Sequence, residues 1–371
     1  MDRDKISDGN LAAILGGFCF EGEYSGYERY GCGHINDTFL FSFKKDGEAC
    51  VNYIVQRVNG GIFKDVPSLM KNFELVTDFL KRKAEAEGID ASRGVLTLIY
   101  TKNGESFVES GGEFFRAFVF IDRATSYQTV GDPSHFFQAG RAFGRFAALL
   151  DDFDAAKLFE SIPDFHDTGK RYQNFLNALA ADKAGRAKDA KEEIEFTAAR
   201  RDITDRVTRL LSSGEIPLRV THNDTKLNNV MIDDQSGEAL AVIDLDTVMP
   251  GSLLYDFGDS IRFGCNSAAE DERDLSKVGF DIGLFKKYAE GYLGEVKRLI
   301  KKSERDLLYF APILMTFECG MRFLTDYLDG DVYFKTKYDS HNLDRAKNQY
   351  KLVLEMEGRS ADMKGIIDSI K

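Results

Sequence analysis

The spacing of apolar residues changes along the chain and divides it into two unequal parts. Before residue 121, short runs in which apolar and polar residues alternate predict β-strands. We expect a hairpin and three further strands there, at residues 28–43, 52–58, 97–100 and 114–120. One amphipathic stretch, from Val66 to about Lys83, predicts a helix after the third strand. This is the pattern of a small, β-rich lobe.

Beyond residue 133 the apolar positions recur at helical spacing. Phe136, Phe143, Phe146 and Leu150 share one face of a predicted helix, and such a stripe is typical of a core rather than of a cofactor site. Residues 180–213 are rich in charges of both signs, which predicts an exposed helix.

The polar segment between these two parts contains Gly131 and Pro133, as expected of a linker. We therefore predict an α+β, bilobal fold with a small β-rich N-terminal lobe and a larger, mainly helical C-terminal lobe. The expected boundaries are 1–120 for the nucleotide-binding lobe, 121–133 for the linker, and 134–371 for the catalytic and substrate-binding lobe.

A polar run between two short apolar runs carries the clearest chemistry. Residues 218–220 and 230–232 predict strands, so the sequence HNDTKLNN from His222 to Asn229 forms the loop between them. A further strand at 239–243 returns from a turn and delivers Asp244 beside that loop.

Asp224, Asn229 and Asp244 have the order that protein-kinase-like phosphoryl transfer needs. The loop Asp accepts the proton of the attacking hydroxyl, while the Asn five residues later and the Asp after the hairpin hold magnesium. A single Asp or Asn in a loop is usually a turn residue, so the joint spacing is what favours an ATP- and Mg²⁺-dependent kinase. We expect His222 to brace the loop by hydrogen bonds.

The loop and the following Ile243-Asp244 pair resemble the aminoglycoside phosphotransferase and choline kinase superfamily. Five segments between residues 33 and 334 more closely resemble the bacterial N-acetylhexosamine 1-kinases: GHINDTF, VNGGIF, RVTHNDTKLNN, IDLDTVMPGSLLYDFGDSIRFG and ECGMRFLTDYLDGDVYF. The resemblance implies a protein-kinase-like fold that binds ATP between its lobes. It also implies transfer to the anomeric hydroxyl of GlcNAc or GalNAc, which gives a sugar 1-phosphate, with Asp224 as catalytic base.

The nucleotide side of the site has several candidates in the first lobe. Gly31 and Gly33 allow backbone N–H groups to approach phosphates closely. Gln56 stands where this fold usually has a lysine, and Arg57 follows it. Successive strand residues face opposite sides, so only one of the two points at ATP.

Three further residues complete the expected nucleotide site. Glu74, on the next helix, is the candidate partner of the basic position. By resemblance, Phe120 and Ile121 at the start of the linker form the adenine hinge.

The acceptor side depends more on resemblance. Glu318, Arg322 and Asp326 recur at steps of four in the predicted helix 307–328, a pattern that alone indicates a solvated, salt-bridged face. The resemblance instead assigns Arg322 and Tyr333 to the sugar pocket, and it adds two polar residues, His34 and Thr247. A neutral sugar is bound by hydrogen bonds, whereas choline or an aminoglycoside needs acidic or aromatic lining.

Composition removes several other classes. A net charge of −12, from 61 acidic and 49 basic residues, argues against nucleic acid as a partner. No P-loop motif, signal peptide or apolar run of about 18 residues occurs, so we expect a cytoplasmic protein without a Walker-type site or a membrane contact. Five scattered cysteines indicate neither a disulfide framework nor a zinc site, and no protein partner is inferred.

Two alternatives stay open at this point. A kinase of the same fold could act on an amino alcohol, a homoserine-like amino acid or an aminoglycoside. The missing lysine at Gln56 also fits a nucleotide-binding protein without catalysis.

Overall fold

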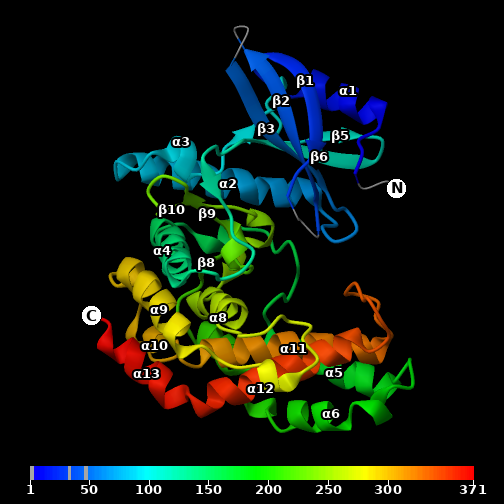
Figure 1. Cartoon of the computed structure of the whole chain (residues 1–371), viewed down its shortest axis with the longest axis vertical. Helices are drawn as coiled ribbons and strands as arrows, with labels where there is room; N and C mark the ends of the chain where they lie inside the picture. The colour runs from blue at the N-terminus through cyan, green and yellow to red at the C-terminus, as the bar shows by residue number, and fades with distance from the viewer. Residues whose placement is uncertain (1–3, 32–34, 46–48) are drawn as a thin grey trace.

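The computed structural model describes residues 4–31, 35–45 and 49–371. An antiparallel sheet occupies one end of the molecule and a mainly helical region the other (Figure 1). The predicted α+β, bilobal fold is confirmed. Of the candidate residues, Gly33 and His34 lie outside the described part of the chain.

The N-terminal sheet has the strand order β1-β2-β3-β6-β4, with β5 paired to β6, and every pairing is antiparallel. Its strands are β1 (Glu23–Arg29), β2 (Asp37–Lys45), β3 (Ala49–Val58), β4 (Leu98–Ile99), β5 (Val108–Ser110) and β6 (Glu113–Val119). The predicted hairpin and three strands are confirmed, although the hairpin strands extend further. The pattern missed β5 and the first helix, α1 (Asp8–Gly17), whose apolar residues have no helical periodicity.

Strand alternation gives this sheet two different faces. Phe39, Phe41 and Phe115 pack on one side in a cluster with Ile14 of α1. The other side packs on the helix α2 (Val66–Ala86), which confirms the helix predicted from Val66. A residue on β3 therefore faces either α1 or α2, and this determines which side chains can reach the second lobe.

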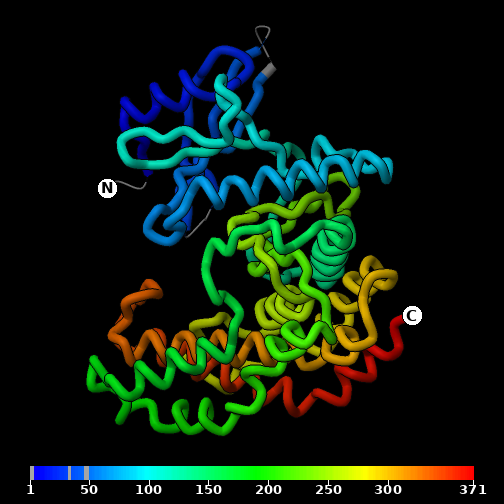
Figure 2. The backbone as a smooth tube through the Cα atoms, turned by 180° about the vertical axis from the view of Figure 1, so that it is seen from behind, coloured from blue at the N-terminus to red at the C-terminus, as the bar shows by residue number. Residues whose placement is uncertain are grey.

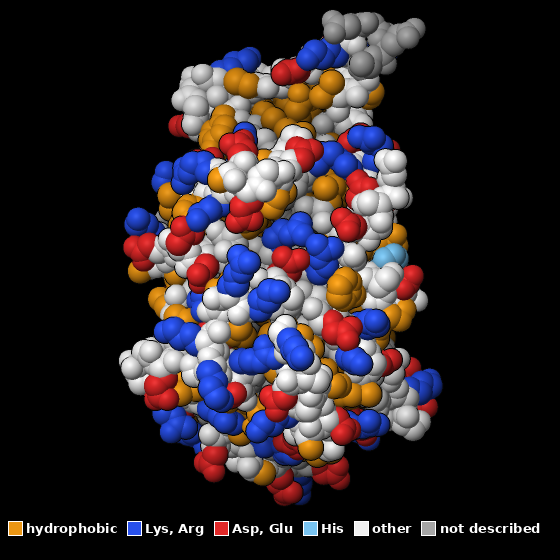
Figure 3. Space-filling view, turned by 90° about the vertical axis from the view of Figure 1, so that its left-hand side faces the viewer, with side chains coloured by type: hydrophobic (Ala, Val, Ile, Leu, Met, Phe, Trp, Pro, Cys, Tyr) orange, Lys and Arg blue, Asp and Glu red, His pale blue; other side chains and the backbone are white. Residues whose placement is uncertain are grey.

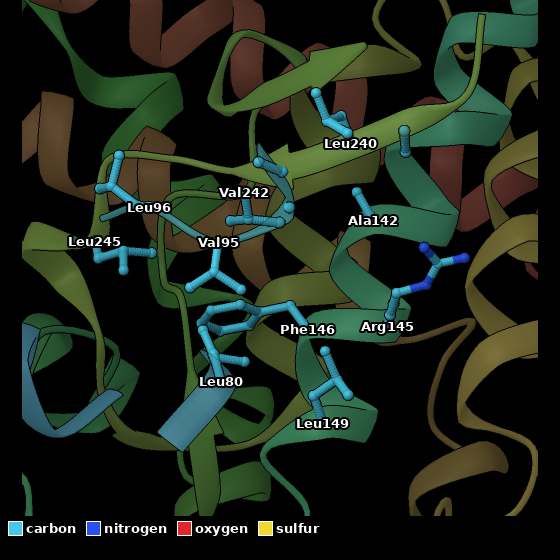
Figure 4. Close-up of a pocket in the computed structure, with 13 residues that line it drawn as sticks. Leu80, Val95, Leu96, Ala142, Arg145, Phe146, Leu149, Leu240, Val242 and Leu245 are labelled. Atoms are coloured by element: carbon cyan, nitrogen blue, oxygen red, sulfur yellow. The ribbon is translucent and has the colours of Figure 1, made fainter. Parts of the chain in front are cut away.

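Helix α2 also joins the two lobes, because it lies across the boundary between them (Figure 2). One apolar cluster contains Phe73 of α2, Phe118 of the sheet, and Phe146 and Leu245 of the C-terminal lobe. A small crevice between the lobes is lined almost wholly by aliphatic and aromatic side chains, with the ring of Phe146 at its centre (Figure 4). The lobes thus share buried apolar surface.

The C-terminal lobe is built mostly from helices, with three short strand pairings. Its helices are α4 (Pro133–Leu149), α5 (Thr168–Ala181), α6 (Lys191–Ala198), α7 (Arg206–Ser213), α8 (Leu253–Gly264), α9 (Ile282–Val296), α10 (Lys302–Arg305), α11 (Ala311–Asp329), α12 (His341–Gly358) and α13 (Ser360–Ser369). The remaining short elements are α3 (Ala91–Gly94), β7 (Ala124–Thr125), β8 (Arg219–Thr221), β9 (Val230–Asp233), β10 (Ala239–Val242) and β11 (Met249–Gly251). The sheets have the orders β10-β9-β7 and β11-β8, so the linker contributes β7 as a strand.

The prediction of one continuous exposed helix over residues 180–213 is wrong. Helix α5 ends at Ala181, the following Asp182 has a left-handed φ of 35°, and two separate helices, α6 and α7, follow. Thr197 of α6 is fully buried, with its hydroxyl 2.6 Å from that of Tyr350. The composition favoured helix throughout, but it did not mark the breaks.

The surface bears charges of both signs. Lys and Arg side chains are intermixed with Asp and Glu on the face drawn in Figure 3. In the described part of the chain, each helix is too short or too polar to cross a bilayer.

Helices α4 and α9 cross closely through glycines on both partners. A Cβ atom at Gly291 of α9 would collide with the carbonyl oxygen of Phe137, and one at Gly144 of α4 would lie 2.8 Å from the carbonyl oxygen of Tyr292. Only glycine permits this backbone approach. Gly294, one turn further on α9, has open space around its Cβ position.

We expect Gly291→Ala to destabilise the C-terminal lobe by about 1–3 kcal/mol, because the added methyl forces the two helices apart. Gly294→Ala is the matched control, and should leave stability unchanged or raise it by up to about 1 kcal/mol through helix propensity. Urea unfolding followed by circular dichroism measures both. Equal stability of the two variants would contradict this account of the crossing.

Candidate active site

The structure brings the three predicted catalytic-loop residues together. The loop runs from β8 through a 3₁₀ turn (Leu227–Asn229) into β9. The side-chain amide of Asn229 donates to Oδ2 of Asp224 at 3.0 Å and to its carbonyl oxygen at 2.8 Å. The backbone N–H of Ile243 donates to the carbonyl of Asn229 at 2.9 Å, which places Asp244 beside the loop.

Helix α8 holds this loop in place through two carboxylates. Asp256 accepts the backbone N–H groups of His222 and Asn223, both at 2.8 Å, and Asp259 accepts that of Thr225 at 3.1 Å. Both acids are buried, so their hydrogen bonds satisfy loop N–H groups that would otherwise need water as a partner. The sequence shows these residues only as part of the segment YDFGDS, and our reading missed their role.

The loop backbone adopts two uncommon conformations. Asn223 has φ of 64° and Asp244 has φ of 60°, in the left-handed region where Asn and Asp are the most tolerated non-glycine residues. His222 braces the loop as predicted: Nε2 donates to the carbonyl of Ile243 at 3.0 Å, and Nδ1 accepts from the N–H of Asp224 at 3.3 Å. The site is thus held in a conformation that the surrounding contacts impose.

Lys226 is a charged group that our sequence analysis missed. Its Nζ lies 2.7 Å from Oδ1 of Asp224, and both side chains are half-buried. Burial alone would raise the pKa of Asp224, but the charge of Lys226 and its hydrogen bond hold that pKa below its usual range. A cation two residues after the predicted catalytic Asp was the available signal in the sequence.

The surroundings of Asp244 fit a divalent cation. Desolvation by the surrounding protein, followed by the nearby carboxylates of Asp246 and Asp224, raises the pKa of Asp244 to about 7. No group of three or more His, Cys, Asp or Glu side chains in the described residues forms a ready-made metal site. Magnesium usually binds one or two protein oxygens plus phosphate oxygens and water, so Asn229 and Asp244 suit it when a nucleotide completes the shell.

Gln56 faces the second lobe, as part of a buried network. Its side-chain oxygen accepts two bonds from Arg116 of β6, at 3.0 and 2.8 Å, and its amide donates to Thr38 at 3.1 Å. Arg116 is fully buried and forms an ion pair of 2.5 Å with Asp246 of the C-terminal lobe. A cation is therefore present near the expected lysine position, but it comes from the neighbouring strand.

Two of the nucleotide-side candidates, Arg57 and Glu74, form other ion pairs in the structure. Arg57 points to the α1 face of the sheet, where it pairs with Asp37 at 2.7 Å and Glu113 at 3.2 Å. Glu74 pairs with Lys71 at 3.0 Å near the surface, because the α2 positions beside Arg116 are taken by Met70 and Phe73. Arg57 faces α1 because successive residues of a strand point to opposite faces of the sheet. Glu74 lies away from Arg116 because of its position around the axis of α2.

The other nucleotide candidates lie close to one another. Gly31 has φ of 70°, which glycine adopts without strain. Its neighbour Tyr30 packs edge-to-face on Phe120, with 5.8 Å between ring centroids. Phe120 and the buried Ile121 follow β6 directly, so the glycine turn and the predicted hinge meet.

The acceptor candidates occupy two different environments. Thr247 is buried, and its hydroxyl donates to the carbonyl of His222 at 2.7 Å, so it supports the loop. Arg322 instead lies over the rings of Phe165, Tyr333 and Phe334, at 5.2, 5.8 and 5.6 Å from their centroids.

The predicted polar stripe of α11 is not a solvated face. Glu318 and Asp326 are both buried. Glu318 accepts from the Thr168 hydroxyl at 2.5 Å and lies 2.7 Å from His166, whose other ring nitrogen is 3.5 Å from the carbonyl of Asn223. This chain of contacts links α11 to the catalytic loop, and His166 was absent from our candidates.

Known proteins share this sequence pattern and this fold. A profile described as the phosphotransferase enzyme family matches residues 27–289. The structure of an aminoglycoside phosphotransferase from Alicyclobacillus acidocaldarius is similar, with a TM-score of 0.63, 13% identity, and coverage of 99% of this chain and 98% of that one.

Two further structures are similar. The microcompartment-associated aminopropanol kinase has a TM-score of 0.54 and 15% identity, over 95% of this chain and 97% of that one. A spectinomycin phosphotransferase in complex with ADP and spectinomycin has a TM-score of 0.52 and 14% identity, over 95% and 97%. These identities show the fold alone, while the family match confirms the predicted superfamily.

We expect Arg116→Gln to lower the free energy of unfolding by about 3–5 kcal/mol, because it leaves Asp246 buried without its cation. The double variant Arg116→Gln/Asp246→Asn should recover most of that loss. Urea denaturation of the wild type, both single variants and the double variant measures the coupling. Additive effects of the two substitutions would show that the ion pair does not join the lobes energetically.

Proposed function

The chain belongs to the phosphotransferase enzyme family, and we propose that it is an ATP- and Mg²⁺-dependent kinase acting on the anomeric hydroxyl of an N-acetylhexosamine. The geometry of Asp224, Lys226, Asn229 and Asp244 carries the proposal for phosphoryl transfer. Structures of the same fold hold ADP with spectinomycin, or AMP-PNP with Ca²⁺ and amicoumacin, which supports a nucleotide between the lobes.

In the proposed reaction, Asp224 accepts a hydrogen bond from the anomeric hydroxyl and takes its proton as the oxygen attacks the γ-phosphorus. The new O–P bond forms while the bond between the γ-phosphorus and the β,γ-bridging oxygen breaks, and ADP leaves. The low pKa of Asp224 keeps it ionised and ready to orient the hydroxyl.

Lys226 is the proposed cation for the transferred phosphoryl group. It is half-buried at the catalytic loop, whereas Arg116 is fully buried and bonded to Gln56 and Asp246. Asn229 and Asp244 would hold Mg²⁺, which offsets the charge of the phosphate oxygens. The backbone at Gly31 and the amide of Gln56 complete the phosphate side, and Phe120 and Ile121 border the adenine.

The charge around Arg322 supports a sugar as the acceptor. Arg171 and Arg322 line the same cavity, where burial and then the charge of Arg322 lower the pKa of Arg171. Two guanidinium groups repel the cationic acceptors of choline or aminoglycoside type, but they donate hydrogen bonds to sugar oxygens. Tyr333 adds an exposed ring and hydroxyl beside them.

We expect the protein to convert GlcNAc or GalNAc with ATP and Mg²⁺ into a sugar 1-phosphate. Incubation with these sugars, and separately with aminopropanol, choline, homoserine and an aminoglycoside, followed by phosphorus NMR, identifies the product. A phosphate on the anomeric carbon supports the proposal. An ester on one of the amines, or ATP binding without transfer to any acceptor, would contradict it.

We expect Asp224→Asn to lower kcat by about 10²–10⁴-fold, because the amide cannot take the hydroxyl proton. Asp234→Asn, in the exposed turn between β9 and β10, is the matched control and should retain activity. Steady-state kinetics with a coupled ADP assay measures both, with thermal unfolding as a check of folding. Near-normal turnover in a folded Asp224→Asn protein would remove Asp224 from the role of base.

A further inference from the structure

A cavity of about 550 Å³ opens beside Arg322, between α5, α11 and the segment that follows α11. These elements lie next to one another at the end of the molecule away from the sheet (Figure 1). Its polar lining includes three cations, two carboxylates and several neutral groups: Arg171, Lys183, Arg322, Asp326, Asp329, Asn174, Asn177, Thr325 and Tyr333. The volume is in the range of small-molecule sites.

Its two guanidinium groups have no carboxylate partner among the described residues. Arg171 donates to the carbonyl oxygen of Phe165, from Nε at 3.2 Å and from an η nitrogen at 3.0 Å. Arg322 lies over the ring of the same Phe165. Burial and the charge of Arg322 lower the pKa of Arg171. Both guanidinium groups thus contact Phe165, and Arg322 also lies over the rings of Tyr333 and Phe334.

The carboxylates near this pair are bound elsewhere. Glu318 is held by His166 and Thr168, and Asp329 pairs with Lys183 at 2.9 Å. Asp326 accepts three backbone N–H groups of the segment after α11, at 2.9, 2.7 and 2.9 Å. That segment carries Tyr333, so Asp326 shapes the cavity wall instead of balancing its charge.

The cavity leads away from the catalytic loop. Glu318 lies near the catalytic loop, because it contacts His166, which in turn contacts the carbonyl of Asn223. Arg322 lies one helical turn further along α11. Asp329, at the far end of the cavity lining, lies about 10 Å beyond Arg322 at 1.5 Å per residue. An acceptor phosphorylated near Asp224 that reaches Arg322 can therefore continue past it.

We propose that this cavity is a subsite for the remote part of an acceptor longer than one sugar ring, and that this remote part carries a carboxylate. The proposal rests on the proposed function, since it extends the same acceptor site. A carboxylate accepts paired N–H donors from guanidinium groups, and it would give Arg171 and Arg322 a direct ion-pair partner, which none of the described carboxylates provides. The favoured acceptor has an N-acetylhexosamine at the reducing end and a hexuronic acid as the second ring.

The test compares three acceptors with ATP and Mg²⁺: the N-acetylhexosamine alone, its disaccharide with a neutral hexose, and the same disaccharide with a hexuronic acid. We expect kcat/KM to be at least tenfold higher for the acidic than for the neutral disaccharide. Arg171→Gln should remove this preference. Lys188→Gln, at an exposed position after α5, is the control, because it removes one positive charge outside the cavity lining and should keep the preference.

Calorimetric titration of the three sugars into wild type and variants gives a readout that needs no turnover. Binding of the acidic disaccharide that depends on Arg171 supports the subsite, even if no sugar is phosphorylated and the proposed function fails. Equal kcat/KM and equal affinity for both disaccharides overturn the subsite, even if the single sugar is phosphorylated. If Arg171→Gln does not fold, Asn174→Ala tests the same wall of the cavity. The proposal is overturned if this variant keeps the full preference for the acidic disaccharide and if binding of that disaccharide does not depend on salt.

Discussion

The ion pair between Arg116 and Asp246 joins the sheet of one lobe to the segment that carries Asp244 in the other. Both residues are buried, and a buried charge is stable only when its partner stays in place. Asn36, at the end of the glycine turn, donates to the same Asp246 at 2.5 Å. A single carboxylate therefore contacts both Asn36, which precedes β2, and Arg116 of β6, and so ties these two parts of the N-terminal lobe to the segment after Asp244.

The catalytic loop depends on a second set of buried carboxylates. Asp256 and Asp259 of α8 accept hydrogen bonds from backbone N–H groups of the loop, and these bonds fix its conformation. Helix α8 in turn packs closely on α11, where a Cβ at Gly258 would collide with Ala311 and Met315. The loop, α8 and α11 thus form one rigid unit. Positioning of this kind is the main demand that phosphoryl transfer makes on a protein.

Much of this arrangement could be predicted from the sequence wherever neighbouring residues alone determine the local structure. The strand–loop–strand pattern placed Asp224, Asn229 and Asp244 together, because short apolar runs and turn residues report directly on the backbone. The partners across the lobes could not be found in this way. Arg116 reaches Asp246 from 130 residues away, and the facing of Glu74 depends on the rotation of α2, which packing decides. The sequence alone did not decide which face of the sheet the Arg57 side chain occupies. In the structure, the pairing of β3 with β2 and β6 turns this side chain toward α1.

The acceptor end shows why charge must be judged locally. The chain has a net charge of −12, yet Arg171 and Arg322 meet at a cavity whose neighbouring acids are bound to His166, to Lys183 and to backbone N–H groups. Such an arrangement costs free energy in the empty protein, since like charges repel and burial removes water. The aromatic ring of Phe165 reduces that cost for Arg322 by a cation–π contact, and its carbonyl does so for Arg171. Phe165 precedes His166, which contacts both Glu318 and the carbonyl of Asn223. Under the proposal above, an acceptor bound by the two guanidinium groups would therefore lie one residue away from a direct contact with the loop.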